Sequence, residues 1–145
     1  LSELASYFPG MKPGWTASEV LPGGDLPGGD RAAFLAALCA RHPGIGVDVL
    51  RPIARRHGTL AAQVLGDARA SADLGEDFGA GLTAREVDWM IEHEWAQTAD
   101  DVLWRRTKCG LPMTAAQRAR VAAYSRNSGR KSGSSAVVGV YPPSS

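Results

Sequence analysis

A histidine flanked by two acids is the first feature of this chain that could do chemistry. His93 lies between Glu92 and Glu94, a setting that suits acid–base catalysis or metal binding. The HExxH spacing that places two histidines on one helical face is missing, since His42 and His57 fall in other segments. We therefore interpret His93 as a structural histidine and expect no metal site.

The two cysteines could supply a nucleophile or a disulfide. Cys39 and Cys109 are far apart in sequence and form no CxxC or metal-ligand spacing. A nucleophilic pair would need a histidine in a positive cleft, whereas Cys39 falls on the apolar stripe of a predicted helix. We expect Cys39 to pack in the core. A reducing compartment is the simpler interpretation, with one disulfide left open.

A glycine-rich segment before the first predicted helix could cradle a phosphate group. It contains Pro22-Gly23-Gly24-Asp25 and Pro27-Gly28-Gly29-Asp30, but neither a P-loop ending nor a GxGxxG pattern. Asp30 also occupies the N-cap position, where its carboxylate would repel a second anion. Arg55-Arg56-His57 resembles a phosphate clamp, but these residues close a helix whose C-terminal dipole they complement. We expect no cofactor at either place.

Glu94 and Arg106 are the charged residues most suited to a structural role. Glu94 lies seven residues beyond Val87, and Arg106 lies four beyond Val102, so both fall on inward stripes of consecutive predicted helices. The short turn Ala96-Gln97 allows the two faces to meet. An unpaired carboxylate on such a face is costly. We predict a mostly buried Glu94–Arg106 ion pair, structural rather than catalytic.

Apolar residues recur with a helical period after the glycine-rich segment. Three short helices are predicted first: one capped by Asp30 with Phe34, Leu35, Leu38 and Cys39 inward; one from near Asp48 to Gly58 with Leu50, Ile53 and Ala54 inward; and one capped by Thr59 with Leu60, Val64, Leu65 and Ala68 inward.

Stronger helix signals follow in the second half of the chain. A capping box at Thr83–Glu86 opens a helix expected to run to Trp95 or Ala96, with Val87, Met90, Ile91 and Trp95 facing the core. A further helix is predicted from Thr98, with acidic residues in its first turn, basic residues in its last, and Gly110 as its C′ residue. The last helix starts at a second capping box, Thr114–Gln117, and carries Val121, Ala122 and Tyr124.

These elements predict an all-α fold, a compact bundle of five or six short helices. Residues 1–29 read as an arm or linker, 30–125 as the helical domain, and 126–145 as a flexible low-complexity tail. The charge of +1 argues against a nucleic-acid partner. No apolar run has the length needed to cross a bilayer.

One aromatic residue is displaced from the apolar stripe of its own helix. Trp104, with Arg105 beside it, falls on a different side from Val102 and Arg106. Tryptophan and arginine are enriched at interfaces. We predict that Trp104 and Arg105 belong to an interdomain surface.

Three segments carry a resemblance to a known family. The run from Glu92 to Lys108, EHEWAQTADDVLWRRTK, resembles the C-terminal domain of FAD-dependent aerobic glycerol-3-phosphate dehydrogenases and the related alpha-glycerophosphate oxidases. Leu65-Gly66-Asp67-Ala68 and Leu21-Pro22-Gly23-Gly24-Asp25 are similar to that family as well. The resemblance covers roughly Tyr7 to Tyr124.

The resemblance implies a parent enzyme that oxidises sn-glycerol 3-phosphate to dihydroxyacetone phosphate, passing electrons through FAD to quinone, or to oxygen in the oxidases. In that family the flavin fingerprint and the substrate-binding residues precede this domain. We therefore expect no catalytic or cofactor-binding residue here, and a fragment that is inactive alone. Its partner would be the missing N-terminal flavin and substrate domain, in a cytoplasmic parent, with peripheral attachment of that parent to the cytoplasmic membrane left open.

Two alternatives remain at this point. The chain could be an independent helical protein-interaction module that shares the ancestry and acts alone. A small hydrolase using His93 and a cysteine is disfavoured, because the sequence lacks the geometry of such a site.

Overall fold

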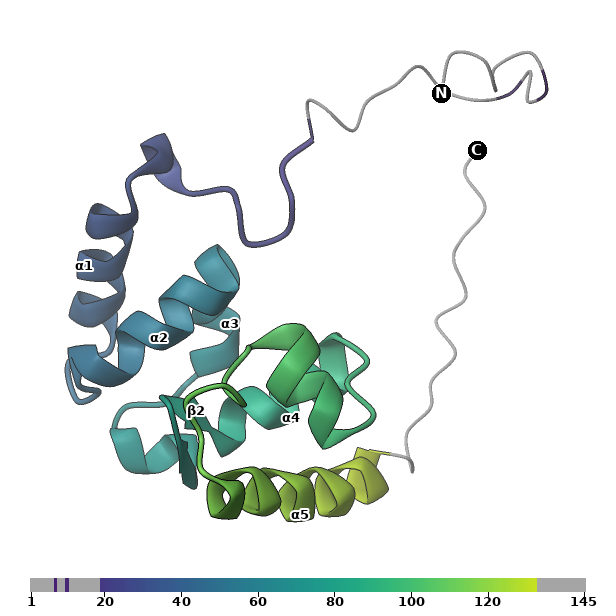
Figure 1. The fold of residues 1–145 in the computed structure, drawn as a ribbon. Coiled ribbons are helices and arrows are strands. Elements are labelled where there is room, and N and C mark those ends of the chain that lie inside the picture. The colour runs from purple at the N-terminus through teal and green to yellow at the C-terminus, as the bar shows by residue number, and fades with distance from the viewer. Residues whose placement is uncertain (1–6, 8–9, 11–18, 133–145) are drawn as a thin grey trace.

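The chain folds into a mostly helical body, which confirms the all-α prediction (Figure 1). The computed structural model describes Tyr7, Gly10 and residues 19–132. Its α-helices are α1 (Arg31–Arg41), α2 (Val47–His57), α3 (Ala61–Leu65), α4 (Ala84–His93) and α5 (Ala115–Ser132). Shorter elements are the 3-10 turns η2 (Pro27–Gly29), η3 (Gly58–Leu60) and η4 (Ser71–Leu74), the π-helix η5 (Asp101–Arg106), and strands β1 (Asp77–Gly79) and β2 (Leu82–Thr83).

Helices α1, α2 and α3 enclose the first of two apolar clusters (Figure 1). Asp30 starts α1 as predicted, because its carboxylate accepts the N–H groups of Ala32 and Ala33 at 2.9 and 3.0 Å. Leu50 and Ile53 of α2 are fully buried. The predicted stripe of α1 packs inward, with Cys39 partly buried against the cluster.

The second cluster lies between α4, α5, η5 and the short hairpin. Phe78 of β1 is fully buried there, with Tyr124 of α5 packed edge-on at a ring-centroid distance of 5.3 Å. Trp89 of α4 packs against both clusters and so joins the two halves of the molecule.

The antiparallel pair β1–β2 was not predicted. Its turn contains three consecutive residues with positive φ, namely Gly79, Ala80 and Gly81. Two glycines make that backbone accessible at low cost. Strands of three and two residues are too short to display an alternating pattern, so the sequence carried no clear strand signal.

The helix predicted to reach Trp95 or Ala96 ends earlier, and Trp95 is not in the core. Helix α4 stops at His93, Trp95 adopts φ +57°, and its side chain is 82% exposed. Ala96 is buried instead, and its N–H donates to the Met90 carbonyl at 3.0 Å. The left-handed residue therefore turns the chain so that Ala96 fills the place predicted for Trp95.

The segment predicted as a helix from Thr98 to Lys108 forms the π-helix η5. Its predicted start at Thr98 is confirmed: Asp101 accepts the Thr98 N–H at 2.9 Å, and the Asp101 N–H donates to the Thr98 hydroxyl at 3.2 Å, which together form a capping box. At the other end, the Thr107 N–H donates to the carbonyl of Val102, five residues earlier, at 3.1 Å. The left-handed position is Lys108, with φ +61°, rather than Gly110.

Part of the glycine-rich segment packs onto the body. The Thr59 N–H donates to the Gly23 carbonyl at 3.1 Å, and the Thr59 hydroxyl donates to Asp25. Thr59 therefore does not cap α3, which begins after the turn η3.

At the C-terminal end, α5 continues to Ser132, beyond the predicted end at Ser125. Residues 133–145 of the predicted tail lie outside the described part of the chain.

None of the helices in the described ranges is both long enough and apolar enough to cross a membrane.

Candidate functional site

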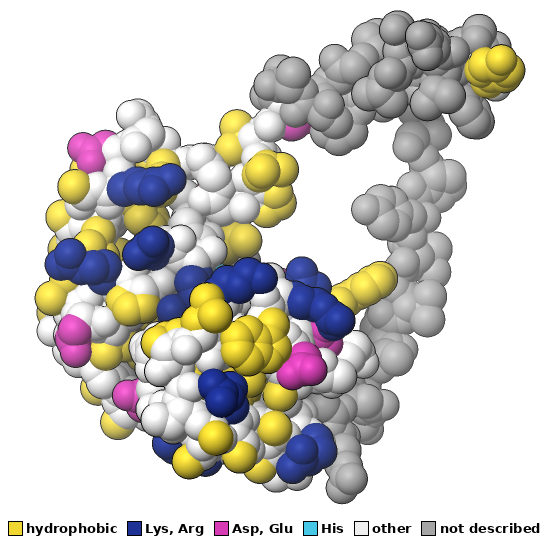
Figure 2. Space-filling model, in the orientation of Figure 1, with side chains coloured by type: hydrophobic (Ala, Val, Ile, Leu, Met, Phe, Trp, Pro, Cys, Tyr) yellow, Lys and Arg dark blue, Asp and Glu magenta, His cyan; other side chains and the backbone are white. Residues whose placement is uncertain are grey.

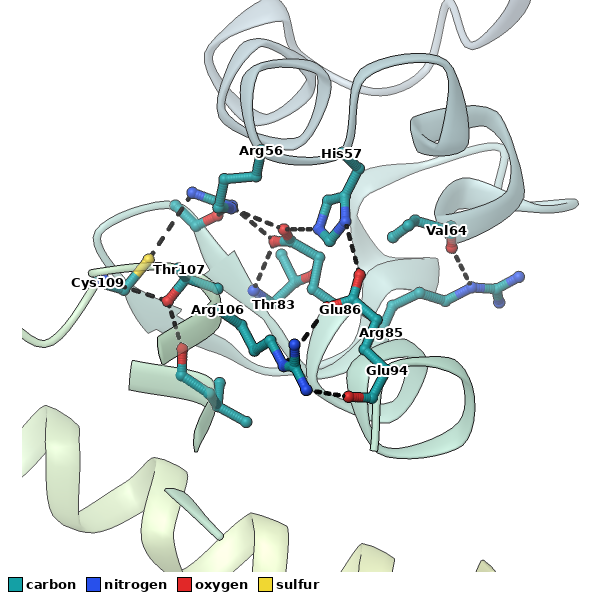
Figure 3. Close-up of polar contacts among 12 residues, drawn as sticks. Arg56, His57, Val64, Thr83, Arg85, Glu86, Glu94, Arg106, Thr107 and Cys109 are labelled. Carbon is teal, nitrogen blue, oxygen red and sulfur yellow. Dashed lines mark hydrogen bonds and ion pairs between the residues drawn. The ribbon is translucent and has the colours of Figure 1, made fainter. Parts of the chain in front are cut away.

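The most deeply buried charge in the described structure belongs to Glu86, in the first turn of α4 (Figure 3). Its side chain is 0% exposed. Arg56 donates to both carboxylate oxygens, from Nε at 2.9 Å and from Nη2 at 2.8 Å, and His57 Nε2 lies 3.1 Å from Oε1. The Thr83 N–H also donates to Oε2 at 3.4 Å, as the capping box predicts. Glu86 thus ties the C-terminus of α2 to the N-terminus of α4.

A second carboxylate extends this network toward the surface (Figure 3). His57 Nδ1 lies 3.7 Å from Glu94 Oε1, and Glu94 Oε2 lies 4.0 Å from Arg106 Nε. Arg106 also donates from Nη2 to the Glu94 backbone carbonyl. The five residues Arg56, Glu86, His57, Glu94 and Arg106, here called the Glu86 network, therefore connect α2, α4 and η5.

The prediction that Glu94 and Arg106 are mostly buried is wrong, although their side chains do meet. They are 27% and 42% exposed, whereas Glu86 is enclosed. Because α4 ends at His93, Glu94 is the C-cap residue and no longer follows the inward stripe of the helix. The seven-residue count from Val87 assumed a longer helix.

Arg56 uses its remaining donors to hold the hairpin in place. Nη2 donates to the Gly81 carbonyl at 2.5 Å, and Nη1 lies 3.8 Å from the Cys109 sulfur. The guanidinium and the Glu86 carboxylate satisfy each other, as the burial of a charge requires. This arrangement favours a structural role for the buried centre of the network over acid–base catalysis.

Of the other residues considered for chemistry, Cys109 meets the network through Arg56. His93 is exposed and stacks on Trp89 with ring centroids 3.8 Å apart. Cys39 is partly buried and Cys109 is buried, and both are free thiols. Within the described ranges no three His, Cys, Asp or Glu side chains gather as they would around a metal ion.

Trp104 and Arg105 lie on an exposed stretch of η5. Trp104 is 36% exposed, and one side of its ring covers Gly110, where an added Cβ would lie 2.7 Å from ring carbons. Arg105 pairs with Asp101 one turn earlier. The hydrogen bond from Arg105 is the first cause, and those from Thr98 and Gln97 further causes, of an Asp101 pKa well below its ordinary value.

A family model described as the C-terminal domain of alpha-glycerophosphate oxidase matches residues 15–127. The chain belongs to this family. The resemblance predicted from the run Glu92 to Lys108 is therefore confirmed.

The individual relatives agree with that assignment. The chain is 42% identical over 121 residues to the aerobic glycerol-3-phosphate dehydrogenase of Escherichia coli, and 40% identical over 124 residues to a glycerol-3-phosphate dehydrogenase of Pseudomonas aeruginosa. It is 34% identical over 119 residues to the D-erythritol 1-phosphate dehydrogenase of Brucella abortus. These alignments include 82–86% of this chain but only 24% of each relative. The chain thus spans about a quarter of the length of the curated relatives it matches.

Proposed function

We propose that this chain is the accessory C-terminal cap domain of an FAD-dependent glycerol-3-phosphate dehydrogenase. The observation that carries the proposal is the family match over residues 15–127 combined with the 24% share of each relative. The parent would oxidise sn-glycerol 3-phosphate to dihydroxyacetone phosphate. Electrons would leave through FAD to quinone or another acceptor, in a cytoplasmic parent that can attach peripherally to the membrane.

The chain itself is proposed to be non-catalytic. Dinucleotide binding needs a free helix N-terminus after a strand and a tight glycine turn. Here the Asp30 carboxylate occupies the first N–H groups of α1, and Gly23 serves instead to dock the preceding segment on Thr59. Arg56 and His57 are engaged by Glu86, so neither is placed as a substrate clamp.

Trp104 and Arg105 are the residues we propose to contact the missing flavin and substrate domain. Trp104 exposes one side of a large ring, and the ring is held in place by Gly110 beneath it. A rigid, partly exposed tryptophan beside a cation is typical of interface centres.

Cofactor retention and turnover test the first part of the proposal. The purified chain mixed with FAD should lose all flavin on desalting and should reduce no dye when glycerol 3-phosphate is added. The full-length parent should retain flavin and reduce the dye. Flavin retained by the chain, or turnover above a no-protein control, would contradict the assignment.

Thermal melting of two proteins tests the docking surface. Trp104→Ala should lower the Tm of the full-length parent more than it lowers the Tm of the isolated chain, because only the parent loses an interdomain contact. Leu111→Ala serves as a control at another exposed apolar residue. Equal shifts in parent and chain for Trp104→Ala would show that the ring stabilises only its own domain.

A further inference from the structure

A groove lies between α1, α2 and the segment that precedes α1. Its volume is about 590 Å³, within the range typical of small-molecule sites. One wall is the segment from Leu21 to Leu26, and the other walls are α1 and α2. The hydrogen bond from Thr59 to Gly23 fixes the first wall against the end of α2. We call this hollow the arginine groove.

The lining of the arginine groove is strongly basic. It includes Arg31, Arg51, Arg55 and Arg56, and no acidic residue. Arg56 is neutralised by Glu86, whereas the other three arginines form no ion pair with any side chain in the described ranges. Figure 2 shows basic side chains over the part of the face formed by α1 and α2, with acidic side chains toward its edge.

The two acids nearest to the lining in sequence, Asp25 and Asp30, form no ion pair with its arginines. Asp25 accepts the Thr59 hydroxyl, and Asp30 accepts two N–H groups of α1. Arg51 and Arg55 are four residues apart on α2, so they project from neighbouring positions on one face of the helix. Two guanidinium forks at this spacing suit a dianion, because each fork can bind two oxygens.

The rest of the lining is apolar. Phe34 and Leu35 of α1 are partly buried along it, and Ala54 of α2 contributes a small apolar side chain. A ligand that used both features would carry a compact doubly charged group joined to an apolar body.

We propose that the arginine groove binds a small organic phosphate ester, with the phosphate on Arg51 and Arg55 and the apolar part against Phe34 and Leu35. The limited volume of the groove favours a small soluble molecule over a membrane lipid. The test uses this chain alone, so failure of this proposal can be distinguished from failure of the proposed function.

Phenyl phosphate is the probe for this site, added to the 145-residue chain and followed by isothermal titration and amide NMR. Saturable binding is expected, with shifts at the lining glycines Gly23, Gly24 and Gly58. Phenol and inorganic phosphate should each bind more weakly, because each supplies half of the contacts. Arg51→Gln and Arg55→Gln should each weaken binding about ten-fold or more, as expected for the loss of a charge-assisted hydrogen bond.

Arg41→Gln is the matched control, an exposed arginine of α1 outside the groove. It should leave the affinity unchanged, and circular dichroism should report the same helix content for all three variants. The proposal is overturned by an absence of saturation, by affinities that Arg51→Gln and Arg55→Gln leave unchanged, or by an equal loss in Arg41→Gln. Binding to phosphatidic acid vesicles without binding to phenyl phosphate would also overturn it, since the ligand would then be a lipid surface.

Discussion

Glu86 and Glu94 share His57 as a partner, but burial separates their energetic roles. Glu86 has no exposed surface and is bound by Arg56 and His57. Glu86→Ala would leave the mostly buried Arg56 guanidinium without its carboxylate and His57 Nε2 without its partner, so we expect the free energy of unfolding to fall by about 3–5 kcal/mol. Urea unfolding followed by circular dichroism measures this loss.

Glu94→Ala is the matched comparison. Because Glu94 and Arg106 are partly solvated, removing Glu94 should cost about 1 kcal/mol or less. Equal losses for the two variants would mean that burial does not set the strength of the Glu86 network.

Tyr124 couples α5 to α4 in a way that depends on pH. Its hydroxyl donates to Asp88 at 2.8 Å, and burial, followed by that hydrogen bond, raises the pKa of the phenol above 10.0. Since the folded pKa exceeds the unfolded one, the stabilising contribution is fully present below about pH 10 and is lost as pH rises through the folded pKa.

Between pH 9 and pH 11, roughly around the ordinary phenol pKa, the free energy of unfolding should therefore fall less in Tyr124→Phe than in the unsubstituted chain. Urea midpoints across this interval test the expectation. An ultraviolet titration of the variant should also lack one phenolate transition. Parallel stability curves for the two proteins would refute the assignment.

The sequence predicted the capping role of Glu86 but not its ion pair. A capping box depends on residues three apart, which a sequence pattern displays directly. Arg56 is 30 residues away, and at the end of α2 its charge already had a local explanation in the helix dipole. Trp95 was misplaced for a related reason: the apolar period continued through it, while the chain turned at His93.

At the scale of elements, one backbone approach holds the glycine-rich segment to the body. Gly58 has φ +56° and ψ −134°, and a Cβ there would lie 1.8 Å from the Gly23 carbonyl oxygen. We expect Gly58→Ala to cost about 2–3 kcal/mol, from backbone strain and from displacement of this segment. Hydrogen exchange of the Thr59 amide should accelerate, since its acceptor is the Gly23 carbonyl.

Gly28→Ala provides the control for strain alone. Gly28 also has positive φ, at +63°, but nothing lies within 4 Å of an added Cβ. Gly28→Ala should lower the free energy of unfolding by about 1 kcal/mol and leave the hydrogen exchange of the Thr59 amide unchanged. If the two variants lose the same stability and show the same Thr59 exchange, the contact between Gly23 and Gly58 does not stabilise the fold.

Sequence patterns predicted the longer helices of this chain better than its short elements. The first two helices and the start of the last were predicted, because caps and apolar stripes are local. In η5 the start at Thr98 was predicted, but the wider turn depends on the Thr107 N–H and hydroxyl, which both donate to the Val102 carbonyl. Those contacts compete with the regular helix, and the apolar period does not record them.

At the scale of the whole molecule, two apolar clusters meet at Trp89 and at the Glu86 network. Trp89 packs against both clusters, and Glu86 of α4 is bound from α2. We therefore expect the clusters to unfold together, so that urea transitions followed by circular dichroism and by tryptophan fluorescence coincide.

The same experiment on Trp89→Ala should separate the transitions, because it removes the side chain shared by both clusters. Val20→Ala, at an exposed position outside both clusters, should keep them coincident. Two separate transitions in the unsubstituted chain would instead mean that the two clusters unfold independently.

The left-handed turn at Trp95 gives this chain a built-in optical reporter. The indole is exposed, but the backbone on both sides of it is fixed. Arg106 donates to the carbonyl of Glu94, and the N–H of Ala96 donates to the carbonyl of Met90. Water around the ring should give it red-shifted emission and easy quenching by acrylamide. Any partner that covers this end of α4 should shift the Trp95 part of the emission to the blue, a shift that a Trp95→Phe variant would lack, so docking can be followed without an added dye.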